Sequence, residues 1–154
     1  VTVSTGSLGH GLSIACGLAI SNKDNHIFCV LGDGEMNEGS VWEAIMFANH
    51  HHLENLTVII DYNKCQATGF TKNIISMEQL KLKLIAFLGS FLEIDGHDLF
   101  EVREKINKNV SYPSIFIANT IKGKGINFME NKPECHTIKL DETQYLKARE
   151  SLNA

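Results

Sequence analysis

Short apolar runs alternate with longer amphipathic segments along the chain. The apolar runs are rich in Val, Ile, Leu and Phe and are bounded by Gly, Asp and Asn, a pattern typical of buried strands. They predict strands at residues 26–31, 56–60, 91–94 and 114–119. The remaining amphipathic or buried segments predict helices at residues 11–21, 39–53, 77–88, 99–109 and 141–152.

Strands separated by helices of this length indicate βαβ units. Such units build a parallel sheet with helices on both faces, so we expect an α/β fold. Ligands of such sheets bind beyond the carboxyl ends of the strands, where the connecting loops converge. The chain has no proline-rich linker and no internal repeat, and its 154 residues suit a single domain spanning residues 1–154.

Composition excludes several classes of protein. Eighteen acidic and 14 basic residues give a formal net charge of −4, which argues against a nucleic-acid partner. No apolar stretch approaches the ~20 residues of a membrane-spanning helix, so we expect no membrane partner either. The four cysteines, Cys16, Cys29, Cys65 and Cys135, are widely spaced without a C-x-x-C motif, which indicates reduced thiols in a cytoplasmic protein.

The strongest local signal is Gly32-Asp33-Gly34, directly after the strand predicted at residues 26–31. Two glycines let the backbone approach a ligand closely while the Asp33 carboxylate projects from the end of the strand. That carboxylate suits a hard cation such as Mg²⁺, which takes oxygen ligands and shares them with phosphates. The alternative is an ordinary turn from strand to helix, in which Asp33 caps the helix.

A second loop strengthens the cation hypothesis. Asn63 follows Asp33 by 30 residues, enough for a helix and a returning parallel strand, so both loops should lie at the same edge of the sheet. An amide oxygen and a nearby backbone carbonyl could complete an octahedral Mg²⁺ site together with Asp33 and a diphosphate. Two coordinated loops arise by chance much less often than one.

With these residues in view, the sequence resembles the transketolases, particularly their N-terminal sections encoded as separate chains. The resemblance rests on GDGEMNEGSVWEA at residues 32–44 and DYNKCQATG at residues 61–69. Further matching blocks are STGSLGHGLS at 4–13, DGHD at 95–98 and TIKGKGINFMENKPECH at 120–136. The resemblance spans nearly the whole chain and implies the thiamine-diphosphate-binding domain of this family.

The resemblance also implies the ligands of the cofactor. Thiamine diphosphate would bind with Mg²⁺, or with Ca²⁺ or Mn²⁺ in its place. Asp33 and Asn63 would bind the metal through their side chains and Cys65 through its backbone carbonyl, while the Gly34 N–H contacts the diphosphate. A metal thiolate at Cys65 is disfavoured, because no second Cys or His stands at the spacing of a zinc site.

Four further positions match functional residues of the family. Glu38 matches a glutamate of the subunit interface that joins a carboxylate network between active sites; alternatively it is a first-turn acid favoured by the helix dipole. Gly6 and Leu8 match positions beside the cofactor, although tight packing of a helix on a strand also explains such glycines. His136 matches a histidine near the diphosphate and the reacting oxygens, suited to proton transfer, whereas an isolated loop histidine is usually just solvated.

Two other loop features are interpreted more simply. His97 in the DGHD block is expected to support the loop after a strand. Lys122 and Lys124 lie in a family loop that leads toward the active site, where either lysine could face an anionic substrate. Their sequence lacks the G-x-x-x-x-G-K-[ST] arrangement of a P-loop.

The reaction that the resemblance implies is transfer of a two-carbon ketol unit between sugar phosphates, as in the pentose phosphate pathway. The glutamate that activates the cofactor belongs to a pyrimidine-binding domain that these 154 residues do not include. A C-terminal transketolase section is therefore the expected partner, within a homo- or hetero-oligomer. The competing hypotheses are half of another thiamine-diphosphate enzyme and a non-catalytic remnant that serves as an interaction module.

The family also has a preceding segment, with early histidines of the cofactor and substrate sites, that has no counterpart before Val1. The domain over residues 1–154 is therefore expected to be incomplete at its N-terminus. A truncated gene product, a fragment and a domain completed from elsewhere all remain open.

Overall fold

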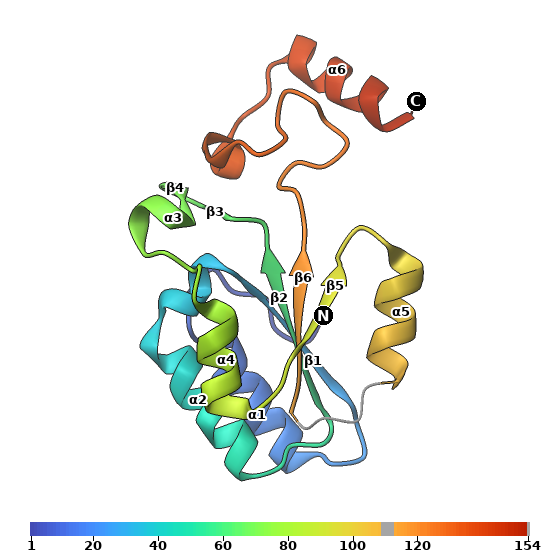
Figure 1. The fold of residues 1–154 in the computed structure, drawn as a ribbon. Coiled ribbons are helices and arrows are strands. Elements are labelled where there is room, and N and C mark those ends of the chain that lie inside the picture. The colour runs from blue at the N-terminus through green and yellow to red at the C-terminus, as the bar shows by residue number, and fades with distance from the viewer. Residues whose placement is uncertain (109–112, 154) are drawn as a thin grey trace.

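The computed structural model describes residues 1–108 and 113–153 and contains a four-stranded parallel sheet (Figure 1). The strands are β1 (Ile27–Gly32), β2 (Leu56–Tyr62), β5 (Leu92–Asp95) and β6 (Ser114–Asn119). Their order across the sheet is β1-β2-β6-β5, and all three pairings are parallel. The predicted α/β fold is confirmed.

Helices pack on both faces of the sheet, as Figure 1 shows. On one face lie α1 (Gly11–Ser21), α2 (Gly39–His50) and α4 (Leu80–Leu88). The other face carries α5 (Leu99–Lys108), which packs against β5. The arrangement follows from the βαβ connections that the alternating sequence pattern predicts.

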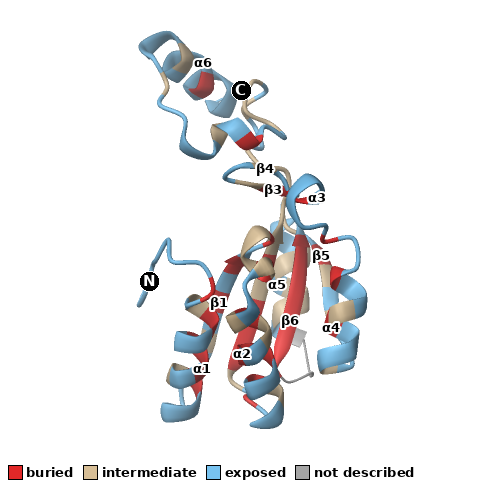
Figure 2. Ribbon diagram, turned by 90° about the vertical axis from the view of Figure 1, so that its left-hand side faces the viewer, coloured by how far each residue is buried: buried red, intermediate tan, exposed pale blue. Residues whose placement is uncertain are grey.

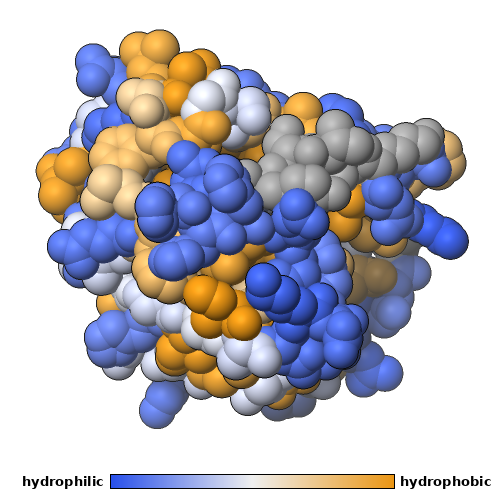
Figure 3. All heavy atoms as spheres, turned by 90° about the horizontal axis from the view of Figure 1, so that it is seen from below, coloured by the Kyte–Doolittle hydropathy of each residue, from blue (hydrophilic) through white to orange (hydrophobic). Residues whose placement is uncertain are grey.

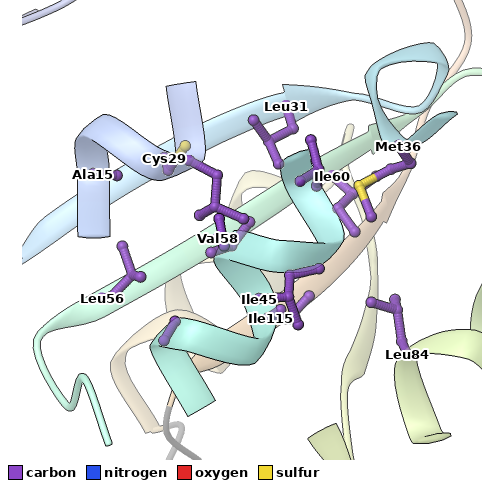
Figure 4. Packing of buried hydrophobic residues seen from close by; sticks show 14 of the residues in the cluster. Ala15, Cys29, Leu31, Met36, Ile45, Leu56, Val58, Ile60, Leu84 and Ile115 are labelled. Carbon is purple, nitrogen blue, oxygen red and sulfur yellow. The ribbon is translucent and has the colours of Figure 1, made fainter. Parts of the chain in front are cut away.

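The main core lies between the sheet and the three helices of the first face (Figure 4). It contains Leu31 from β1, Val58 and Ile60 from β2, Ile45 from α2 and Leu84 from α4. A smaller core on the second face joins Ile94, Phe116 and Ala118, against which Val102 and Ile106 of α5 pack. Continuous apolar runs in β2 and β6 are explained by this double coverage.

The second face is covered unevenly. Val30, Ile59 and Phe116 form one row across β1, β2 and β6. Phe116 is fully buried and Ile59 is half-buried, whereas Val30 is 67% exposed. Phe28, on the same face of β1, is 57% exposed. A hollow of about 630 Å³ lies along the free edge of β1, between β1, α1 and residues 1–5. Figure 2 shows the N-terminal residues projecting outward beside β1 and α1.

Some helices begin or end at residues other than the predicted ones, because the backbone conformation there sets the boundary. The helix predicted at 39–53 ends at His50, because His52 adopts a left-handed conformation with φ 47°. The N–H of His52 donates to Asn49 C=O and that of Leu53 to Ala48 C=O, the pattern of a Schellman motif. The predicted helix at 77–88 begins only at Leu80. The last residue of the helix predicted at 99–109 lies outside the described residues.

Several short elements were not predicted. They are the hairpin β3 (Cys65–Gln66) and β4 (Gly69–Phe70), α3 (Thr71–Ile74), and the 3₁₀ turns η1 (Gly34–Asn37) and η2 (Pro133–Thr137). The last predicted helix is present as α6 (Glu142–Asn153). Figure 1 shows β3, β4, α3 and α6 beyond the carboxyl ends of the strands.

The two ends of the sheet therefore have different characters. Seen from the end where the strands begin, the surface mixes hydrophilic residues with small hydrophobic areas (Figure 3). The opposite end collects the glycine-rich loops and the short elements. In the parts of the chain that the structure describes, no helix is both long and apolar enough to span a membrane.

Candidate functional site

Asp33 lies immediately after β1, where its N–H continues the β1–β2 ladder by donating to Asp61 C=O at 3.1 Å. Its side chain is buried, with the residue 1% exposed. One carboxylate oxygen, Oδ2, accepts the Lys64 N–H at 2.6 Å. The other, Oδ1, is the one buried side-chain polar atom without a hydrogen-bond partner among residues 1–108 and 113–153.

Such an unpartnered oxygen is costly, and the pKa of Asp33 reflects it. Burial raises this pKa to about 6, and the negative charge of Asp61 adds to the rise. The hydrogen bond from the Lys64 N–H, the nearby Gly34 N–H and the positive charge of Lys122 lower the pKa and oppose this rise. A cation beside Oδ1 would offset the burial of this carboxylate and favour its ionised form.

Asn63 stands one residue beyond β2 and is held at both ends of its amide. Its Nδ2 donates to Asp61 Oδ2 at 2.9 Å, and its Oδ1 accepts the Cys65 N–H at 2.9 Å. Lys64 between them has φ 64°, a left-handed conformation that turns the chain from β2 into β3. The turn brings the backbone of Lys64 to Asp33, so the two predicted loops do meet at one edge of the sheet.

Cys65 is buried at the start of β3, and burial raises the pKa of its thiol. The neutral thiol is a poor metal ligand and a poor nucleophile. The described parts of the chain also contain no group of three or more His, Cys, Asp or Glu side chains arranged for a metal ion. Any cation site here would therefore combine one carboxylate with amide and backbone oxygens, a donor set that suits a hard cation.

Gly34 opens η1 directly against the side chain of Gln66. A Cβ at Gly34 would lie 2.7 Å from Gln66 Oε1 and 2.9 Å from Gln66 Cβ. These approaches are too close for any side chain, so glycine is required for the two loops to pack. Gln66 was missed by the sequence analysis, because the hairpin that carries it leaves no periodic signal.

The loop that follows β6 brings Lys122 and His136 over the same edge. Lys122 Nζ lies 3.4 Å from His136 Nδ1, and η2, which carries His136, packs against the hairpin of β3 and β4. His97 Nε2 accepts the Ile121 N–H at 2.8 Å, so His97 supports this loop as expected. Asn131 N–H donates to Lys122 C=O and closes the loop on itself.

The N-terminal glycine turn is attached to the site through Gly9, which has φ 86°. The Gly9 N–H donates to Glu35 Oε1 at 2.9 Å, and its C=O accepts the Ser40 hydroxyl at 3.0 Å. Glu35 and Ser40 were not singled out from the sequence. Their positions just after Gly34 and Gly39 are the only signal that could have pointed to them.

The remaining predicted residues lie at the surface. Leu8 is 53% exposed, and Gly6 is exposed with no atom within 4 Å of the position its Cβ would take. Glu38 is exposed and precedes α2 as its N-cap residue, but its side chain makes no capping hydrogen bond. The structure therefore joins Asp33, Asn63 and Cys65 closely and leaves these three other residues open to solvent.

A carboxylate, an amide oxygen and a glycine turn thus gather at the carboxyl ends of β1 and β2, with a lysine above them. The family model of the transketolase thiamine-diphosphate-binding domain matches residues 1–153. The chain belongs to the transketolase family. The resemblance to N-terminal transketolase sections is confirmed, and with it a thiamine-diphosphate-binding domain.

Similar transketolases come from several bacteria. The 6-deoxy-6-sulfo-D-fructose transketolase subunit SqwG of Clostridium sp. (strain MSTE9) is 40% identical over 152 residues, covering 94% of this chain and 55% of that protein. An apulose-4-phosphate transketolase subunit of Actinobacillus succinogenes is 45% identical over 143 residues, covering 88% and 51%. The chain thus spans about half the length of these curated relatives.

Solved transketolases share the fold. The crystal structure of transketolase from Campylobacter jejuni superposes with a TM-score of 0.89 at 30% sequence identity. The match covers 99% of this chain and 26% of that one. The present chain therefore matches about a quarter of the length of that transketolase.

Proposed function

We propose that this chain is the half of a transketolase that binds the diphosphate of thiamine diphosphate together with Mg²⁺. Ca²⁺ or Mn²⁺ would serve in its place, since both accept oxygen ligands. The observation that carries the proposal is Asp33 Oδ1, which is buried without a partner at the edge of the sheet. A buried carboxylate oxygen of this kind needs a cation or a proton.

Asp33 Oδ1, Asn63 Oδ1 and the Cys65 carbonyl would hold the metal ion. The Gly34 N–H is assigned to the diphosphate, and the Lys122 ammonium, whose charge already reaches Asp33 and Cys65, adds positive charge beside it. When bound, thiamine diphosphate supplies the electron sink of the reaction, and the protein supplies binding, orientation and electrostatics.

His136 is assigned to proton handling at its Nε2 atom. The Lys122 ammonium beside Nδ1 can only donate, so Nδ1 must accept and the ring proton of a neutral His136 must sit on Nε2. That N–H is free to donate to a substrate oxygen, and the exposed position of the ring suits a group that meets substrate.

The proposed reaction is transfer of a two-carbon ketol unit between sugars that carry an anionic group. Support comes from the relatives, whose names specify apulose-4-phosphate and a sulfonated fructose. A pyrimidine-binding chain, corresponding to a C-terminal transketolase section, is the proposed partner. Exposed Glu38 would meet the carboxylate network of a neighbouring protomer, and Gly6 and Leu8 would adjoin the cofactor once the complex forms.

Calorimetric titration with thiamine diphosphate tests the proposal, with Mg²⁺ or with EDTA, on the chain alone and with a pyrimidine-domain partner. We expect binding that requires Mg²⁺ and that is abolished in Asp33→Ala. Asp24→Ala is the matched control, because Asp24 is an exposed aspartate in the loop between α1 and β1, at the opposite end of the sheet. Equal binding by the Asp33→Ala and Asp24→Ala variants would refute the metal and cofactor assignment. So would the absence of Mg²⁺-dependent binding by the wild-type chain, both alone and with the partner.

A further inference from the structure

Asp61 occupies the centre of the carboxyl edge, between the two loops of the proposed cofactor site. It is the penultimate residue of β2 and pairs in register with Gly32 of β1 and Ala118 of β6. Its backbone carbonyl accepts the Asp33 N–H. No role was assigned to Asp61 from the sequence, although it stands two residues before Asn63.

Both oxygens of the Asp61 carboxylate already have partners within the chain. Oδ1 accepts the hydroxyl of Thr120, the first residue after β6, and Oδ2 accepts the Asn63 amide at 2.9 Å. Asp61 therefore ties the end of β6 to the loop after β2. Asp33 differs, since it keeps one buried oxygen without a partner. The two neighbouring carboxylates therefore differ, because both oxygens of Asp61 are held within the chain and one oxygen of Asp33 is not.

The chemistry of this contact decides which way the Asn63 amide faces. An ionised carboxylate can only accept, so Asn63 must turn its NH₂ group toward Asp61 and its oxygen away. That oxygen accepts the Cys65 N–H, which uses one of its two lone pairs. The second lone pair remains available for a cation on the side of the loop that faces away from Asp61.

We propose that Asp61 is a positioning residue that presents the Asn63 amide oxygen to the metal ion. The inference rests on the proposed function, since it concerns the same metal site. Neighbours that orient metal ligands typically change metal affinity by about 10–100-fold when they are removed. Without the Asp61 carboxylate, the Asn63 amide can rotate and turn its NH₂ group toward the metal site. The positive hydrogens of that group repel a cation, so metal affinity falls.

The test exchanges donor and acceptor across this hydrogen bond. In Asp61→Asn the new amide can face Asn63 with either end, so the orientation of Asn63 is no longer fixed. The double variant D61N/N63D restores it, because the amide now at position 61 donates to the carboxylate now at position 63, whose second oxygen faces the metal. The double variant also restores the net charge of the pair. Asp95→Asn is the control, an equal charge change at the end of β5, which is separated from β2 by β6.

Mn²⁺ affinity is measured by electron paramagnetic resonance of free Mn²⁺ at saturating thiamine diphosphate, using the full chain with its pyrimidine-domain partner. Circular dichroism checks that each variant is folded. We expect Mn²⁺ binding at least about tenfold weaker in Asp61→Asn, near wild type in Asp95→Asn, and restored to within about threefold in the double variant.

Two outcomes overturn the positioning role: wild-type Mn²⁺ affinity in Asp61→Asn, or weak affinity that the folded double variant fails to restore. If either Asp61 variant does not fold, Thr120→Val decides instead, because it removes the hydroxyl that holds Asp61. A loss of about threefold or more then supports the role, and an unchanged affinity overturns it. Failure of the wild-type chain to bind Mn²⁺ with thiamine diphosphate refutes the proposed function itself.

Discussion

At the scale of single residues, the Asp33 and Asn63 side chains of the candidate site differ in their hydrogen bonds. Asp33 keeps one buried oxygen without a partner, whereas both ends of the Asn63 amide are engaged. An unsatisfied buried carboxylate lowers the stability of the folded chain unless a bound group supplies the missing partner. The consequence is measurable without any cofactor.

Metal-free protein should lose stability as pH rises from about 4 to about 6. The pKa of Asp33 is about 6 in the folded chain and ~3.9 in an unfolded one, so the folded state binds more protons within this range and stability falls as they leave. The full difference corresponds to roughly 3 kcal/mol. Urea unfolding in EDTA across this range should show the decline, and Asp33→Asn should abolish it. A wild-type profile that matches the variant's would contradict the assignment.

A second residue-scale prediction concerns the contact of Gly34 with Gln66. Gly34→Ala forces a Cβ to within 2.9 Å of the Gln66 Cβ, so we expect it to destabilise the chain by about 1–3 kcal/mol. Gly6→Ala is the control, because nothing lies within 4 Å of its Cβ position. Chemical denaturation of both variants measures the difference, and equal stabilities would show that the loop packing is wrong.

At the scale of elements, the end of α2 shows how backbone conformation overrides a hydrophobic pattern. The pattern continues to Leu53, which is buried, but the helix has already ended at His50. Leu53 reaches the core because the Schellman motif folds it back, with left-handed His52 before it. In a left-handed conformation the Cβ of histidine comes too close to the backbone, a steric cost that glycine does not have.

We therefore expect His52→Gly to stabilise the chain by up to about 1 kcal/mol. His51→Gly is the matched control, since His51 has φ −86° and gains nothing from glycine. There the same substitution should destabilise by roughly 0.5–1 kcal/mol, through the greater freedom of the unfolded chain. Thermal or urea unfolding of the two variants checks the opposite signs; two changes of the same sign would contradict the described helix end.

The sequence was sufficient for the regular elements and for part of the site. Every strand of the main sheet followed from a run of apolar residues, and every longer helix followed from an amphipathic or buried segment. The meeting of the loops that carry Asp33 and Asn63 followed from their place after two parallel strands. The β3–β4 hairpin could not be predicted, since its strands are two residues each and leave no period. Asp61 and Thr120 were missed because their contact joins residues 59 positions apart, which no local pattern encodes.

At the scale of the whole molecule, the sheet is fully covered on one face and partly covered on the other. Side chains of one register row pass from full burial at Phe116 to 67% exposure at Val30. Parallel sheets usually bury both faces, and the apolar character of β1 follows that rule although its second face meets solvent here.

Substitutions on the two sides of this face should differ sharply. Phe116→Ala removes a fully buried ring and should cost about 3–5 kcal/mol. Phe28→Thr changes an exposed ring to another residue that favours strands, so stability should change by no more than about 0.5 kcal/mol. Urea unfolding of the chain on its own measures both. A large loss from Phe28→Thr would mean that this face is covered.

The central claim is that Asp33, Asn63 and the Cys65 carbonyl hold the metal ion of the cofactor. The most direct measurement is anomalous X-ray diffraction from crystals grown with Mn²⁺ and thiamine diphosphate. We expect a strong anomalous peak beside Asp33 Oδ1 and within coordination distance of Asn63 Oδ1 and the Cys65 carbonyl oxygen. Bound thiamine diphosphate with no anomalous peak there, or with the peak at other residues, would contradict this metal site.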